Sequence, residues 1–308
     1  MPLDPQAQAV AAALADFPQP DYATLTVPEY RAMLAAFPPP PPVDVPLSAV
    51  ENRTLTGAAG PLPCRLYRPQ AIGPLPVTVF FHGGGFVSCG LDTHDTLCRY
   101  LAARSGSLVV SVDYRLAPEH RFPAPVDDAV AAVRWVHDHA DEIGAEATRI
   151  VVAGDSAGGN LAAAAAKVLR DGGPAICHQL LLYPVIDSAC DSASFRELAQ
   201  APMLTAEMMR WFWRHYLPDA AAGNDPRASL LNGNLAGLPP AIVITAEEDP
   251  LRDEGEAYAR AMEDAGVRVT LCRWGGQFHG FASLLGTLNA AREALDFTAT
   301  LLAKALAK

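Results

Sequence analysis

Long apolar runs are absent from this 308-residue sequence. A helix needs roughly 18 consecutive apolar residues to cross a membrane, and the alanine-rich run AAAAAKVL is short and contains Lys167. The N-terminal segment has no positively charged leading region, and Asp16 interrupts its apolar residues. It therefore predicts a helix rather than a targeting peptide. We expect no membrane partner.

Positive charge is also scarce. The chain has 23 basic and 34 acidic residues, which gives a formal net charge of −11. Nucleic acids and anionic membranes need clustered lysine and arginine, so both are disfavoured as partners. Only 19% of the residues are charged and 50% are hydrophobic. This composition predicts a large core in one α/β domain, with room for a small appendage.

No pair of cysteines has CxxC spacing. The six cysteines are scattered, and no secretory signal precedes them. Disulfides are rare in the cytosol, so this pattern indicates reduced thiols in a cytoplasmic protein. The residues concerned are Cys64, Cys89, Cys98, Cys177, Cys190 and Cys272.

The first 45 residues form a segment of their own. Residues 4–17 and 27–37 have apolar residues at helical spacing. Pro38–Pro42 follow, and five prolines predict an extended polyproline spacer. Two interpretations of residues 1–45 remain open: an arm docked on the main domain, or part of a helical cap over a site.

After the spacer, short apolar runs alternate with helical patterns. This alternation predicts a mostly parallel sheet with helices on both faces, and ligands bind beyond the carboxyl ends of such strands. Residues 185–235 contain no convincing strand and are interpreted as a cap insertion, which leaves 46–184 and 236–308 as the main domain. The predicted strands are 76–81, 107–114, 149–154, 178–184, 241–247 and 267–274, and the helices between them are 93–106, 126–144, 157–173 and 253–266.

The strongest local signal is RIVVAGDSAGGNLAAAA, a strand followed by a small-residue turn and a helix. The G-x-S-x-G pattern from Gly154 to Gly158 is typical of a nucleophile elbow, which holds a serine at the sheet edge. Ser156 is therefore the candidate nucleophile. The alternative is a tight turn with an incidental serine.

A serine hydroxyl needs a base, and the base needs a carboxylate. After an elbow of this kind the expected chain order is serine, acid, histidine. His279 follows the last predicted strand, and among the eight histidines it alone does so downstream of a candidate acid. Asp249 is preferred as the acid because Pro250 turns the chain there, while the neighbouring Glu247 and Glu248 remain alternatives.

The run HGGG, residues 82–85, follows an early strand. Three glycines let the backbone approach another group closely. Gly83 and Gly84, with Ala157 after the nucleophile, are predicted to donate N–H groups to an oxyanion. His82 is expected to brace the loop. A phosphate-binding loop is the alternative, but the run carries neither Lys-Ser/Thr nor the G-x-G-x-x-G spacing.

Five motifs together resemble the hormone-sensitive-lipase-like carboxylesterases, also called bacterial esterase family IV, of the α/β-hydrolase fold. The resemblance runs from about residue 45 to the C-terminus. The motifs are HGGGF, DYRLAPEH (113–120), GDSAGGN (154–160), DPLRDEGEAYA (249–259) and FHGF (278–281).

The resemblance implies an α/β-hydrolase with a helical cap and with Ser156, His279 and Asp249 as its triad. It implies the same three oxyanion donors, no metal or organic cofactor, and a possible homodimer paired through a sheet edge. Arg115 and Glu119 would brace the loops behind the serine. Cys89 and Glu248 depart from common family residues. One related subgroup, the plant gibberellin receptors, lacks the catalytic histidine. His279 is present in this sequence, so that subgroup is disfavoured.

The predicted function is hydrolysis of small-molecule carboxylic esters of short to medium acyl chain through an acyl-enzyme intermediate. The alternatives are a noncatalytic small-molecule receptor on the same fold and an amidase or peptidase with the same triad. A set of apolar residues is predicted near the substrate, although each could instead be core: Phe86, Leu204, Met208, Trp211, Phe212 and Phe281.

Overall fold

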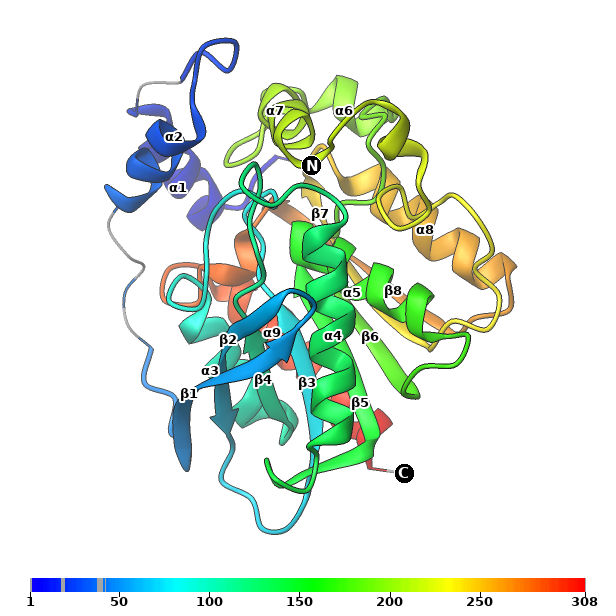
Figure 1. Ribbon diagram of the computed structural model, residues 1–308. Coiled ribbons are helices and arrows are strands. Elements are labelled where there is room, and N and C mark those ends of the chain that lie inside the picture. Colours follow the sequence, from blue (N-terminus) through cyan, green and yellow to red (C-terminus); the bar gives the residue numbers. More distant parts are fainter. Residues whose placement is uncertain (1, 18–19, 38–40, 42, 308) are drawn as a thin grey trace.

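The computed structural model describes residues 2–17, 20–37, 41 and 43–307. An eight-stranded sheet has the order β1-β2-β4-β3-β5-β6-β7-β8 (Figure 1). The strands are β1 (Ala49–Gly57), β2 (Gly60–Arg68), β3 (Leu75–Phe81), β4 (Leu108–Val112), β5 (Ala145–Asp155), β6 (Ile176–Leu182), β7 (Ala241–Glu248) and β8 (Val269–Phe278). From β4 to β8 every neighbouring pair is parallel. The predicted α/β fold with a mostly parallel sheet is confirmed.

The hairpin of β1 and β2 was not predicted. Both of its pairings, β1 with β2 and β2 with β4, are antiparallel. Pro61 and Pro63 lie in β2, and proline argues against a strand because it lacks an N–H donor. Both prolines lie in the part of β2 that pairs with β1 and lies before the residues paired with β4.

The central strands are apolar on both faces because helices cover both faces. In β3, Val79 packs in one core cluster and Phe80 in the other, as the alternation of side chains along a strand requires. Helices α4 (Ala124–Asp138), α5 (Ala157–Leu169) and α8 (Arg252–Asp264) contribute to the first cluster. Helices α3 (Asp95–Ser105) and α9 (Asn289–Leu306) contribute to the second.

The two segments predicted as cap contact each other. Residues 1–45 hold α1 (Pro5–Ala15) and α2 (Val27–Ala35), and residues 185–235 hold α6 (Ala193–Glu197), α7 (Ala206–Tyr216) and the short helix η1 (Ala221–Asn224). Trp211 Nε1 of α7 donates to the Leu25 carbonyl (3.2 Å), and Figure 1 shows α2 and α7 at the same end of the molecule. The predicted proline spacer lies almost entirely outside the described residues.

Candidate active site

The turn between β5 and α5 holds Ser156 in a strained conformation. Its φ of 53° and ψ of −120° lie outside the common regions for a residue with a side chain. The turn is so tight that only glycine fits at the position two residues away on either side. A Cβ on Gly158 would lie 1.9 Å from the Phe81 carbonyl oxygen, and one on Gly154 would lie 2.2 Å from the Gly158 carbonyl oxygen.

Three distant segments meet at this serine. Ser156 Oγ lies 2.8 Å from His279 Nε2, and His279 Nδ1 lies 2.7 Å from Asp249 Oδ2. The second carboxylate oxygen, Oδ1, accepts the Leu251 N–H at 2.8 Å, which fixes the orientation of the acid. The Tyr183 ring packs edge-on against the imidazole at 5.0 Å between centroids. The structure thus brings the three predicted residues into one hydrogen-bonded chain.

Asp249, and not its neighbouring glutamates, reaches the imidazole. It follows the end of β7 and is fully buried. Glu247 instead accepts the Gly276 N–H at 3.1 Å. Of the three adjacent acids, the structure therefore places Asp249 in the position that orients a base.

The prediction for Gly83 is contradicted by its backbone contact. The Gly83 N–H donates to Asp155 Oδ1 at 2.8 Å, so it is already used. Burial alone would raise the pKa of Asp155, but His94 and the Gly83 N–H lower it below its ordinary value. His94 Nε2 lies 3.1 Å and 3.2 Å from the two carboxylate oxygens. Asp155 therefore ties the start of the glycine loop, residues 82–88, to the turn that carries Ser156.

His82 lies behind the loop and is fully buried. Its Nδ1–H donates to the Gly83 carbonyl at 2.7 Å, and its ring stacks on Tyr114 with centroids 4.4 Å apart. Burial lowers the pKa of His82 to about 4, so the imidazole is neutral at neutral pH. The Tyr114 hydroxyl donates to the His82 carbonyl at 2.7 Å, which further fixes this part of the loop.

Arg115 and Glu119 have separate partners. Arg115 makes a two-pronged ion pair with Asp128 of α4, with distances of 2.8 Å and 2.9 Å. Glu119 pairs with Arg31 of α2 at 2.7 Å, a contact that the sequence analysis missed. Arg115 thus ties the motif DYRLAPEH to α4 of the main domain, and Glu119 ties it to α2 of the N-terminal segment.

Most of the predicted substrate residues pack in the core. Phe86 stacks on Tyr216 with centroids 3.8 Å apart, and Phe281 packs beside Trp274. Phe212 is buried too, but its ring covers the glycine loop, because a Cβ on Gly85 would lie 2.3 Å from it. Leu204 and Trp211 are buried, and Met208 is partly buried.

Comparisons with known proteins identify the family of this chain. A family model described as an α/β-hydrolase fold matches residues 78–283. The carboxylesterase NlhH of Mycobacterium tuberculosis is 45% identical over 262 residues, which cover 82% of each chain. The ethyl acetate hydrolase of Pseudomonas putida is 41% identical over 242 residues and 76% of each chain. The structure of a hyperthermophilic esterase from Pyrobaculum calidifontis is 41% identical and covers 99% of each chain, with a TM-score of 0.92.

The chain belongs to the α/β-hydrolase family. The resemblance to its hormone-sensitive-lipase-like carboxylesterases is confirmed. Among the residues that the structure describes, no cluster of three or more His, Cys, Asp or Glu side chains could hold a metal ion. Over the same residues, no helix is both long and apolar enough to span a bilayer.

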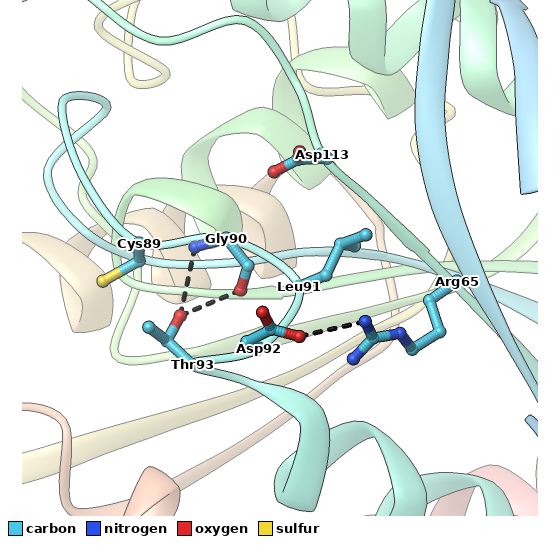
Figure 2. Close-up of a pocket in the computed structure, with 7 residues that line it drawn as sticks. All are labelled: Arg65, Cys89, Gly90, Leu91, Asp92, Thr93 and Asp113. Atoms are coloured by element: carbon cyan, nitrogen blue, oxygen red, sulfur yellow. Dashed lines mark hydrogen bonds and ion pairs between the residues drawn. The ribbon is translucent and has the colours of Figure 1, made fainter. Parts of the chain in front are cut away.

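A cavity of about 390 Å³ adjoins the end of the glycine loop of this α/β-hydrolase. Figure 2 shows the Arg65–Asp92 ion pair (2.9 Å) on one side of it, with the Cys89 sulfur pointing away from the other labelled residues. Asp113 also lines the cavity, whereas Ser156 does not. The charged lining does not match the apolar acyl chain of an ester.

Met203 is an exposed residue beside the loop that carries His279, and the sequence analysis did not predict it. Its side chain is 39% exposed, and its φ is 67°. A Cβ on Gly280, the residue after His279, would lie 3.7 Å from the Met203 side chain. No sequence signal distinguishes Met203 from the adjacent Leu204, because the difference in exposure arises from the tertiary fold.

Proposed function

We propose that this α/β-hydrolase hydrolyses small carboxylic esters by acyl transfer to Ser156. The observation that carries the proposal is the chain Ser156 Oγ–His279 Nε2–His279 Nδ1–Asp249 Oδ2, with steps of 2.8 Å and 2.7 Å. This arrangement supplies a nucleophile, a base and the acid that orients the base. The names of the relatives, carboxylesterase and ethyl acetate hydrolase, support an ester as the substrate.

The reaction proceeds in two halves. Ser156 Oγ attacks the ester carbonyl as His279 Nε2 takes its proton, and the imidazolium returns that proton to the departing alcohol. Water then gives a proton to His279 and attacks the acyl-enzyme, which releases the acid and restores the Ser156 hydroxyl. The Asp249 carboxylate stabilises the imidazolium in both halves.

The oxyanion is held by Gly84, Gly85 and Ala157 in this proposal. The Gly84 and Gly85 N–H groups have no acceptor within the described residues. Their φ angles of 111° and 61° are ones that glycine adopts readily. Ala157 begins α5, so its N–H has no partner inside the helix and lies next to the nucleophile. Gly85 thus replaces Gly83, whose N–H is engaged by Asp155.

Esters with short to medium acyl chains are the proposed substrates. In this proposal Met203 lies at the rim of the site, where it contacts the acyl chain. The relative named ethyl acetate hydrolase supports short chains. Across p-nitrophenyl esters from C2 to C12, we expect the largest kcat/KM at C8 or below. Met203→Asp should lower kcat/KM for the hexanoate about tenfold and for the acetate less than threefold. The hexanoyl chain is long enough to contact the introduced carboxylate, whereas the acetyl group is not.

The matched control is Ile72→Asp, which adds the same charge at a fully exposed apolar residue between β2 and β3. This variant should keep the wild-type chain-length profile. A maximum at C12 or longer would refute the proposed acyl range. An equal loss for acetate and hexanoate in Met203→Asp would refute the role of Met203.

A further inference from the structure

Arg31 of α2 contacts the segment that carries the proposed oxyanion donors. Its Nε donates to the Val87 carbonyl at 2.7 Å, and Nη2 donates to the Ala117 carbonyl at 3.0 Å. The same guanidinium makes a two-pronged ion pair with Glu119, at 2.7 Å and 2.9 Å. One side chain from the N-terminal segment thus joins two loops of the main domain.

The two loops are also joined to each other. The Ala117 N–H donates to the Phe86 carbonyl at 2.9 Å, one residue before the carbonyl that Arg31 holds. Arg31 therefore closes a small network in which Phe86 and Val87 are both fixed through their carbonyl oxygens. A shift of the guanidinium would displace both loops together.

The position of Val87 sets the position of the glycines. The Gly84 carbonyl accepts the N–H groups of Val87 and Ser88, both at 3.1 Å, and the Ser88 hydroxyl at 2.9 Å. This compact turn transmits a displacement at Val87 to Gly84 and Gly85. On its other side the loop is anchored through the Gly83 N–H, which Asp155 accepts.

The ion pair with Glu119 orders the guanidinium. Arg31 and Glu119 side chains are 32% and 53% exposed, so the pair adds little to folding stability. The guanidinium nevertheless lowers the pKa of Glu119 to about 2, so the carboxylate stays charged at neutral pH. A charged Glu119 aligns the guanidinium so that its remaining N–H groups reach the two carbonyls.

We propose that Arg31 is a positioning residue for ester hydrolysis, because it fixes the glycine loop through the Val87 carbonyl. Helix α2 is then part of the catalytic apparatus rather than a passive docked arm. The inference rests on the proposed esterase function. It concerns the alignment of the oxyanion donors and not the nucleophile.

The test variant is Arg31→Lys, which keeps the charge but cannot reproduce the planar fork of donors. Removing an oxyanion donor costs on the order of 10²–10³ in kcat, and misplacing one should cost less. We expect kcat to fall about tenfold, with KM within about threefold of wild type. Glu119→Gln keeps the Arg31–Val87 bond available, so its kcat should fall less than in Arg31→Lys.

The control is Arg53→Lys on β1. Arg53 makes an ion pair with Glu142 of similar exposure, 36% and 58%, but does not touch the glycine loop. This variant should keep the wild-type kcat. Circular dichroism would check the fold of each variant.

A second readout separates positioning from general destabilisation. An alkyl boronic acid forms a tetrahedral adduct with an active serine, and an oxygen of this adduct occupies the oxyanion site. Its affinity, measured by calorimetry, should weaken about tenfold in Arg31→Lys, in parallel with kcat. Affinity for a neutral amide analogue of the substrate should be nearly unchanged.

The outcomes are distinguishable. Wild-type kcat in Arg31→Lys would overturn the inference, as would a lower kcat with unchanged boronate affinity. In either case, the proposed function would still hold if the wild-type protein hydrolyses esters. A wild-type protein that hydrolyses no ester would refute the proposed function itself.

Discussion

Ser156→Ala should abolish ester hydrolysis, with a fall in kcat on the order of 10⁶. Without the hydroxyl there is no nucleophile, and the remaining His279 and oxyanion donors give only the residual acceleration of an aligned site. The variant should fold, because the Ser156 side chain makes no capping bond to α5. Hydrolysis of p-nitrophenyl butyrate and circular dichroism, measured on the same preparation, would check both expectations.

A matched control is Ser111→Ala, which removes a fully buried hydroxyl from β4. It should retain wild-type kcat, because β4 contributes no residue to the triad. A folded Ser156→Ala protein with more than about 1% of wild-type kcat would contradict the role of Ser156, since loss of a nucleophile costs far more than that.

Asp249→Asn should lower kcat about 10⁴-fold while the fold stays intact. The Leu251 N–H donates to Asp249 Oδ1 at 2.8 Å, and an Asn carbonyl oxygen can accept that same bond. The Asn amide nitrogen then faces His279 Nδ1, which must become the acceptor. The imidazole proton moves to Nε2, which faces Ser156 Oγ at 2.8 Å and can no longer act as a base.

Glu248→Gln is the control for this prediction. It removes a neighbouring acid whose role the sequence leaves open, and we expect kcat within about threefold of wild type. A pH profile of kcat/KM for each variant should show the same pattern, with the large loss confined to Asp249→Asn. High activity in Asp249→Asn together with a large loss in Glu248→Gln would assign the acid to Glu248.

The sequence predicts the parallel part of the sheet well, because apolar runs buried on both faces leave a clear pattern in β3, β5 and β7. It fails at the β1–β2 hairpin for a physical reason. Pro61 and Pro63 lack the N–H that a central strand needs, yet they lie outside the stretch of β2 that pairs with β4. A proline is tolerated in a strand where no neighbouring strand needs an N–H from that position. Local sequence does not show which positions these are.

In the candidate site, too, local sequence predicts some features and not others. The order of Ser156, Asp249 and His279 follows from the motifs and from the position of each residue after a strand. The motifs do not show which of the three adjacent glycines have a free N–H. The Gly83 N–H donates to Asp155, a residue 72 positions away in the sequence. Arg31 was missed for the same reason, since its contacts with Val87 and Glu119 span 56 and 88 positions.

Covalent labelling is the most direct test of an activated Ser156. The protein would be treated with a p-nitrophenyl alkylphosphonate, and the modified peptide located by mass spectrometry. We predict one phosphonyl group on Ser156 in the wild type, much slower labelling in Asp249→Asn, and none at this position in Ser156→Ala. A folded wild-type protein that stays unlabelled would contradict the account and favour a noncatalytic receptor.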